Sequence, residues 1–342
     1  MKYKVMGRGG LRVSELCLGT MTFGEEWGWG SDRKESKKVF DAYANAGGNF
    51  IDTANRYTEG TSERLVGEFM GKERDHFVLA TKYTLYMDKR DVNSCGNHRK
   101  NMIQSLNASL KRLNTDYIDL FWLHAWDFTT RIDEVMRGLD DLVSSGKILY
   151  IGISNTPAWV ISRANTLADL RGLTPFVSLQ IEYNLVERTP ERDLLPMARS
   201  MDIGVCPWGV LAAGVLTGKY NKGSKGEPGL RLEGRPIDKG KLKISEEVVK
   251  IAKEIGCKPG HVAISWLSRQ PGIVSPIIGA RTVGQLKDNI ASLKCKLDDD
   301  HIKRLNKISA IDLGYPHDFL RKDVVRDLIY GPFEIDQEKL RS

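Results

Sequence analysis

Short apolar runs alternate along this chain with longer stretches in which apolar positions recur every three or four residues. The short runs predict β-strands and the longer stretches predict amphipathic helices. The predicted strands are residues 16–20, 49–53, 77–82, 118–124, 148–154, 177–183, 203–208 and 275–280. The predicted helices are residues 34–45, 62–70, 100–113, 133–145, 157–170, 192–200 and 246–255, followed after the last strand by 285–292 and 298–309. Two alternating runs, 3–6 and 12–15, flank Gly7-Arg8-Gly9-Gly10 and predict a leading β-hairpin.

This alternation indicates an α/β protein with a (β/α)8 fold, the TIM barrel. The strand at 118–124 is almost continuously apolar, as is typical of parallel strands buried on both faces. The rival fold, a doubly wound nucleotide-binding sheet, normally carries G-x-G-x-x-G after its first strand, and that pattern does not occur. We therefore expect one barrel domain over residues 1–342, with an N-terminal β-hairpin and extra C-terminal helices. The tail, 311–342, is expected to cap the barrel or to contact a neighbouring subunit of a homo-oligomer.

The composition is that of an ordinary globular protein, with 41% hydrophobic and 28% charged residues. The five cysteines are scattered and none forms a C-x-x-C pair, which predicts reduced thiols and neither a zinc site nor a disulfide framework. The histidines show no metal-ligand spacing. Neither a signal peptide nor a run of 18 apolar residues is present, so we expect a cytoplasmic protein without a membrane segment.

The net charge of +7 is concentrated in one segment, residues 219–243, which holds eight Lys and Arg residues against three Asp and Glu. One basic, Gly-rich stretch without a known nucleic-acid-binding motif does not predict a nucleic-acid partner. Its composition favours a flap that closes over a small anionic ligand, and a solvated charged loop is an equally plain interpretation. Protection of this segment from trypsin by the ligand would distinguish the two.

Four side chains of chemical use fall at or just after the carboxyl ends of predicted strands, where barrel enzymes carry their active sites. They are Asp52, Tyr57, Lys82 and His124. Each has an ordinary structural interpretation by itself: a turn cap, a loop aromatic, a lysine at the barrel rim and a core histidine. Their convergence on one rim favours a shared catalytic role.

The sequence resembles the aldo-keto reductase family over nearly its whole length. The motifs that carry the resemblance are F-I-D-T-A-N-R-Y (50–57), L-A-T-K (79–82), F-W-L-H (121–124), G-I-S-N (152–155), Q-I-E-Y-N (180–184), L-T-G-K-Y (216–220) and I-I-G-A-R-T-V-G-Q-L-K-D-N (277–289). The resemblance is closest to the subgroup that includes potassium-channel β subunits and bacterial aryl or sugar-aldehyde reductases. It implies that Asp52, Tyr57, Lys82 and His124 are the family's catalytic tetrad.

The chemistry of this tetrad is consistent with reduction of a carbonyl group by NADPH. Hydride delivered to the carbonyl carbon leaves an alkoxide that must be protonated, and Tyr57 is the expected proton donor. An ammonium about 4 Å away, at an effective dielectric of about 20, could lower the tyrosine pKa by up to about three units before Asp52 offsets part of that field. Asp52 would hold Lys82 in place, and His124 would donate a hydrogen bond to the carbonyl oxygen.

The resemblance also implies a set of cofactor-binding residues. Ser154, Asn155 and Gln180 match the groups that bind the nicotinamide carboxamide, and Trp208 stands where the family usually has a stacking tyrosine. Arg281 matches the arginine that grips the 2′-phosphate. The complete set is Ser154, Asn155, Gln180, Trp208, Leu211, Gly214, Lys219, Gly279, Arg281, Gln285 and Asn289. A departure from the family pattern is Gly209-Val210-Leu211 in place of Ser-Pro-Leu.

The substrate is expected to be a small aldehyde or ketone held by aromatic residues of the rim loops. The candidates are Trp27, Trp29, Tyr83 and Trp126, with Tyr86 and Phe128 nearby in sequence. The alternative function is a cofactor-binding regulatory subunit of the channel-β type with little turnover. The barrel motifs start almost at Met1, without a long preceding segment, and this favours the enzyme. Loss of NADPH absorbance with a panel of aldehydes and ketones would separate the two functions.

Overall fold

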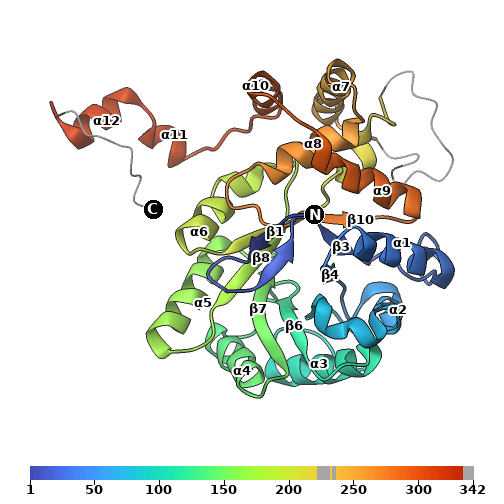
Figure 1. Cartoon of the computed structure of the whole chain (residues 1–342). Helices are drawn as coiled ribbons and strands as arrows, with labels where there is room; N and C mark the ends of the chain where they lie inside the picture. The colour runs from blue at the N-terminus through green and yellow to red at the C-terminus, as the bar shows by residue number, and fades with distance from the viewer. Residues whose placement is uncertain (222–231, 233–235, 334–342) are drawn as a thin grey trace.

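The computed structural model describes residues 1–221, 232 and 236–333, and within these eight parallel strands form the centre of the molecule (Figure 1). From β3 to β9 each strand pairs with the next along the chain, and β10 pairs with β3, which gives the order β10-β3-β4-β5-β6-β7-β8-β9. The Val274 N–H donates to the Val205 carbonyl at 2.9 Å and so joins β9 to the segment before β10. The sheet is therefore a nearly closed barrel. Its strands are β3 (Cys17–Gly19), β4 (Phe50–Asp52), β5 (Val78–Tyr83), β6 (Ile118–Leu123), β7 (Ile148–Ser154), β8 (Phe176–Glu182), β9 (Gly204–Trp208) and β10 (Ile277–Gly279).

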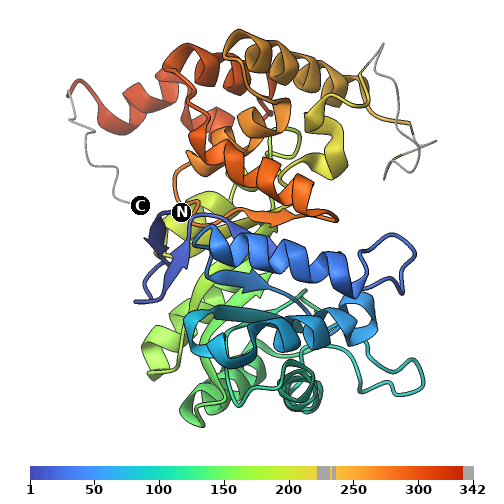
Figure 2. The ribbon, with the colours of Figure 1, turned by 45° about the vertical axis from the view of Figure 1, so that its right-hand side comes forward.

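Helices surround these strands on the outside (Figures 1 and 2). Their apolar faces are buried against the sheet; in α4, for example, Val135 and Leu139 are completely buried while Arg137 faces solvent. The helices are α1 (Arg33–Asn45), α2 (Thr61–Met70), α3 (Arg99–Leu113), α4 (Ile132–Ser144), α5 (Ala158–Arg171), α6 (Leu194–Ser200), α7 (Lys239–Glu254), α8 (Pro259–Ser268), α9 (Val283–Ala291), α10 (Asp299–Ile308), α11 (His317–Leu320) and α12 (Asp323–Tyr330).

The predicted barrel is confirmed, and each of the eight predicted strands lies within two residues of the observed bounds. Helix α8 was not predicted. Five of its ten residues are buried hydrophobics (Val262, Ala263, Ile264, Trp266 and Leu267), so it has no polar stripe wide enough to give an amphipathic pattern.

The predicted flap at 219–243 is partly wrong. Residues 239–243 form the first turn of α7, because the Asp238 carboxylate caps that helix by accepting from the backbone N–H of Gly240 and Lys241, at 2.8 and 3.2 Å. Of the remaining residues, 222–231 and 233–235 lie outside the described part of the chain, so closure of this segment over a ligand stays a prediction.

The N-terminal hairpin, β1 (Tyr3–Val5) and β2 (Arg12–Ser14), closes the amino end of the barrel. Met6 packs with Phe50, Trp122 and Cys206 in the cluster that fills the barrel interior. Gly7, with φ of 50°, approaches the start of β9 so closely that a Cβ there would lie 2.5 Å from the Asp202 carbonyl oxygen. With the amino end blocked, the carboxyl end is the side available for a site.

The tail beyond α10 extends away from the barrel in both views (Figures 1 and 2). Tyr315 and Leu328 are more than four-fifths exposed, and Val325 is the buried residue of α12. The described part of the tail, 311–333, thus does not cap the barrel, and the contact with a neighbouring subunit stays a prediction. None of the helices between residues 1 and 333 that the structure describes is both long and apolar enough to cross a membrane.

Candidate active site

A buried lysine forms the centre of a polar cluster at the carboxyl end of the barrel. The Lys82 ammonium donates to Asp52 Oδ2 at 2.6 Å, to the Thr53 carbonyl at 2.7 Å and to the Tyr57 hydroxyl at 3.1 Å. Its side chain is completely buried, and its three hydrogens meet three acceptors. The Tyr57 oxygen accepts from Lys82, so its own hydrogen is left to be donated to another group.

Tyr57 reaches this lysine from the loop after β4. It begins a short 3-10 turn, Tyr57–Gly60, in which Thr58 and Glu59 have φ values of 45° and 53°. Such values are uncommon for residues other than glycine. The Thr58 hydroxyl holds the turn by donating to the Phe23 carbonyl at 2.6 Å and accepting from the Ser62 N–H at 3.1 Å. The turn is therefore fixed by specific contacts on both sides.

Tyr57 and Lys82 shift each other's pKa in opposite directions: the ammonium lowers that of the tyrosine, and the tyrosine raises that of the lysine. Burial raises the pKa of Tyr57, and the nearby Lys82 ammonium only partly opposes this, so the tyrosine pKa stays above its ordinary value. Burial lowers the pKa of Lys82, but the charge of Asp52 and the contact with Tyr57 outweigh it and raise that pKa overall. The lowering of the Tyr57 pKa that the ammonium alone would produce is therefore not realised, because the partly buried phenolate loses more hydration than one ammonium restores.

His124 follows β6 and stands edge-on to Tyr57, with ring centroids 6.1 Å apart. Burial, followed by the Lys82 charge, lowers the His124 pKa to about 3, so the imidazole is neutral at ordinary pH. Its Nδ1 is buried without a hydrogen-bond partner in the described part of the chain. A buried N–H without an acceptor is costly, which favours the tautomer whose proton is on Nε2.

Asn155 links the histidine to the next strands. Its Nδ2 donates to the His124 carbonyl at 2.9 Å, and its Oδ1 accepts from Trp208 Nε1 at 3.4 Å. Gln180, on β8, donates through Nε2 to Asp52 Oδ1 at 3.0 Å. The structure thus brings Asn155, Gln180 and Trp208 together around the Asp52–Lys82–Tyr57–His124 cluster.

Ser154 provides a test of whether this cluster fits a cofactor. Its hydroxyl is buried at the end of β7 and has no partner among the residues described. A buried polar atom without a partner costs stability unless a ligand satisfies it. The donors and acceptors of Ser154, Asn155 and Gln180 are the groups that a carboxamide requires, so the residues present fit a nicotinamide.

The other predicted cofactor residues form two groups on the same rim. Leu211 precedes the turn Ala212–Thr217, and Gly214 within it has φ of 93°. A Cβ on Gly214 would lie 2.7 Å from the Lys219 ammonium, so these two residues are adjacent.

The second of these groups lies where β10 leads into α9. The Arg281 N–H donates to Gln285 Oε1 at 2.8 Å, and Asn289 Nδ2 donates to the Gly279 carbonyl at 3.2 Å. These bonds fix the loop that carries the exposed Arg281.

The predicted substrate aromatics divide into three sets. Trp27 stands edge-on to Tyr57 with ring centroids 6.4 Å apart and packs on Trp29 at 5.8 Å. Trp126 instead lines a separate cavity. Tyr83 is completely buried with its ring stacked on Phe121, so it offers no surface to a substrate and its assignment to the pocket is wrong.

Two features of the site were missed by the sequence interpretation. The Thr53 carbonyl is one of the three acceptors of Lys82, and a backbone oxygen leaves no mark in the sequence. The cavity beside Trp126 is also lined by Trp159. Trp159 is 62% exposed. In the sequence it stands on the polar face of the predicted helix 157–170, and a large aromatic residue in that position could have indicated a binding surface.

Comparison with known proteins agrees with this geometry. A sequence model described as the Aldo/keto reductase family matches residues 15–310. The chain is 41% identical over 321 residues to norsolorinic acid reductase of Aspergillus flavus, covering 91% of this chain and 81% of that protein. It is 40% identical over 321 residues to norsolorinic acid reductase A of Aspergillus parasiticus, with the same coverage of 91% and 81%. It is 40% identical over 329 residues to the NADP(+) aryl-alcohol dehydrogenase of Phanerodontia chrysosporium, covering 90% and 86%.

Proposed function

This chain belongs to the aldo/keto reductase family, and we propose that it is an NADPH-dependent reductase that converts an aromatic aldehyde or ketone to its alcohol. The observation that carries the proposal is the contact between Lys82 Nζ and the Tyr57 oxygen at 3.1 Å, with Lys82 itself held by Asp52 at 2.6 Å. The names of the relatives, an aryl-alcohol dehydrogenase with NADP(+) and norsolorinic acid reductases, support the cofactor and an aromatic substrate.

The residues that would hold the cofactor are those grouped on the rim. Ser154 and Asn155 would bind the carboxamide, and Gln180 would use its Oε1 because its Nε2 is engaged by Asp52. Trp208 would pack on the nicotinamide ring, and Arg281 would pair with the 2′-phosphate. When bound, the reduced nicotinamide supplies a hydride to the carbonyl carbon.

Tyr57 donates the proton. Its hydroxyl hydrogen is not used by Lys82, so it is available to the carbonyl oxygen, on which negative charge develops. The Lys82 ammonium stabilises the tyrosinate that remains, and Asp52 keeps this ammonium in position. The neutral His124 donates from Nε2 to the same oxygen and orients the substrate.

The Trp27 and Trp29 rings form the wall beside Tyr57 on which an aromatic ring of the substrate would pack. The test is the loss of NADPH absorbance with a matched pair, benzaldehyde and an aliphatic aldehyde of similar size. We expect turnover of both and a lower KM for benzaldehyde. Turnover without an aromatic preference would refute the substrate class, and NADPH binding without turnover of any carbonyl compound would refute the enzyme in favour of a cofactor-binding regulatory subunit.

A further inference from the structure

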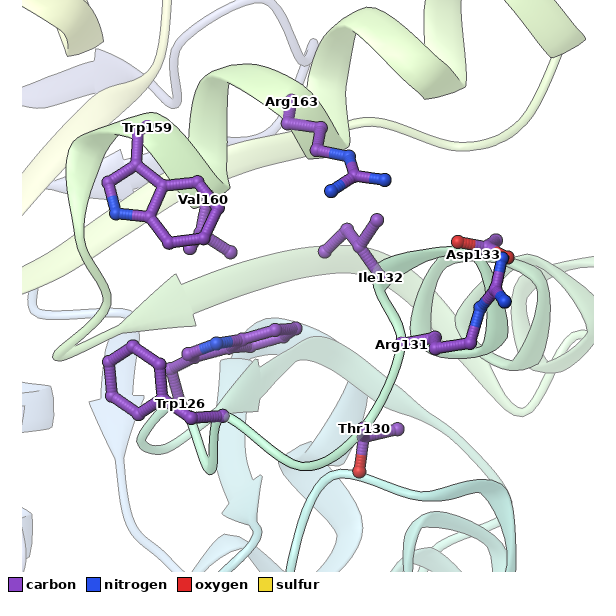
Figure 3. Close-up of a pocket in the computed structure, with 9 residues that line it drawn as sticks. Trp126, Thr130, Arg131, Ile132, Asp133, Trp159, Val160 and Arg163 are labelled. Carbon is purple, nitrogen blue, oxygen red and sulfur yellow. The ribbon is translucent and has the colours of Figure 1, made fainter.

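A cavity of about 450 Å³ opens beside the catalytic cluster, between the loop after β6 and the first turns of α4 and α5 (Figure 3). Tyr57, Lys82 and His124 do not line it. Its volume is within the range of small-molecule sites. The lining residues are Trp126, Phe128, Thr130, Arg131, Ile132, Asp133, Trp159, Val160 and Arg163.

Aromatic rings from two elements form the sides of this cavity. Figure 3 shows Trp126, from the loop after β6, opposite Trp159 of α5. Trp159 and Phe128 are 62% and 70% exposed, although large aromatic side chains are mostly buried in globular proteins. Such a group of rings around a cavity favours a flat apolar ligand.

Hydrogen bonds fix the conformation of the loop that carries Phe128. Phe128 has φ of 57°, an uncommon conformation for a bulky residue. The preceding Asp127 carboxylate fixes it by accepting from the N–H groups of Asn97, Thr129 and Thr130, at 2.6 to 2.9 Å, and from the Thr130 hydroxyl at 2.8 Å. A strained backbone held by four hydrogen bonds indicates that the exposed ring is placed in advance of any ligand.

A cation faces the apolar walls. The Arg163 guanidinium projects from α5 toward Ile132 across the cavity (Figure 3). Asp133 is close enough for the Arg163 charge to help lower its pKa, but its carboxylate forms its ion pair with Arg131. Arg131, the other cation, is paired with Asp133 at 2.8 Å. The lining therefore carries a net charge of +1, located at Arg163.

A second cavity of about 450 Å³ adjoins the first and shares Arg131, Ile132, Asp133 and Arg163 with it. It runs along α5 to Leu170, which is 81% exposed, and to Arg171. The two cavities form one cleft with Arg163 at their junction and further apolar surface beyond it.

We propose that this cleft binds an aromatic carboxylate, with its ring between Trp126 and Trp159 and its acid group on Arg163. The walls match the ring in shape and polarity, and the guanidinium matches a carboxylate by charge and by paired hydrogen bonds. The site is separate from the residues proposed to perform the reduction. Binding there does not depend on cofactor or turnover.

The test is calorimetric titration of the full chain without cofactor, with 2-naphthoate and its neutral counterpart, 2-naphthalenemethanol. Arg163→Gln should weaken naphthoate about 10- to 100-fold, as expected for a charge-assisted contact, and leave the alcohol unchanged. Trp159→Ala should weaken both. Both substituted side chains are exposed on α5, so neither change should affect folding.

Arg137→Gln is the matched control, since this exposed arginine of α4 lies outside both cavities and should leave naphthoate binding unchanged. Trp27→Ala removes an aromatic wall beside Tyr57 and should also have no effect. Absence of saturable naphthoate binding, equal weakening by Arg137→Gln, or a loss with Trp27→Ala and not with Arg163→Gln would each overturn the proposal.

Discussion

Replacing Lys82 by methionine removes the one cation inside the proposed proton-donating cluster while keeping a side chain of similar length. In the parent, the ammonium lies 3.1 Å from the Tyr57 oxygen and 2.6 Å from Asp52. Methionine leaves the tyrosine without a donor and Asp52 buried without a cation. Activity and stability should both fall, for different reasons.

The magnitude of the loss of activity follows from the distance. Two unit charges 3.1 Å apart interact by about 5 kcal/mol at an effective dielectric of about 20, which corresponds to about four pKa units for the tyrosinate. If about half of that charge has developed in the transition state, the barrier rises by about 2.7 kcal/mol and kcat falls about 100-fold. The unpaired Asp52 should lower the free energy of unfolding by about 3–5 kcal/mol.

A double variant separates the two effects. Lys82→Met combined with Asp52→Asn removes both charges, and the asparagine oxygen can still accept from Gln180. We expect the double variant to regain most of the thermal stability while kcat for aldehyde reduction stays low, with the Kd for NADPH within about threefold of the parent. Recovery of kcat together with stability would show instead that the lysine acts only by holding the fold.

The remaining predictions concern pH and the cofactor. The raised pKa of Tyr57 keeps its proton in place and His124, with a pKa of about 3, does not titrate near neutrality, so kcat for reduction should be flat from about pH 6 to about 9 and fall only at higher pH; a step near pH 6.5 in the pH profile would contradict this. Ser154→Ala removes a buried hydroxyl that has no partner among the described residues, so the melting temperature of the cofactor-free protein should hold or rise while NADPH binds about 2- to 13-fold more weakly by titration. A loss of stability without a loss of affinity would mean that the hydroxyl is structural. Arg281→Ala should weaken NADPH about 10- to 150-fold and barely alter NADH; equal weakening of both would place the preference elsewhere.

The strands and most helices could be predicted because the burial of each element leaves a regular pattern of apolar residues in the sequence. The nearly continuous apolar run of β6 and the apolar stripe of α4 are direct consequences of their positions in the barrel. Helix α8 was not predicted because it is buried on most of its surface, and the start of α7 was not predicted because its first turn is exposed and rich in lysine. Hydrophobic periodicity indicates a helix only where one face is apolar and the opposite face is polar, and neither segment has this contrast.

The candidate site was predictable as a set of residue types at strand ends, but its electrostatics were not. Sequence spacing places Lys82 near Tyr57, yet only the three-dimensional structure shows that the tyrosine is buried deeply enough for its pKa to rise. Tyr83 was misplaced for a related reason: it follows Lys82 on β5, and neighbouring residues of a strand point to opposite faces, so its ring enters the outer core. The cleft at Arg163 is formed where the loop after β6 meets α4 and α5, an arrangement that no single segment of the sequence reveals.

The most direct test of the proposed reaction is a single-turnover measurement on Tyr57→Phe, which removes the proton donor and little volume. With saturating NADPH and benzaldehyde, we expect the reduction rate to fall about 100-fold or more, with NADPH affinity unchanged in a parallel fluorescence titration. Rates comparable to the parent in the presence of tightly bound NADPH would show that the proton comes from a group other than Tyr57.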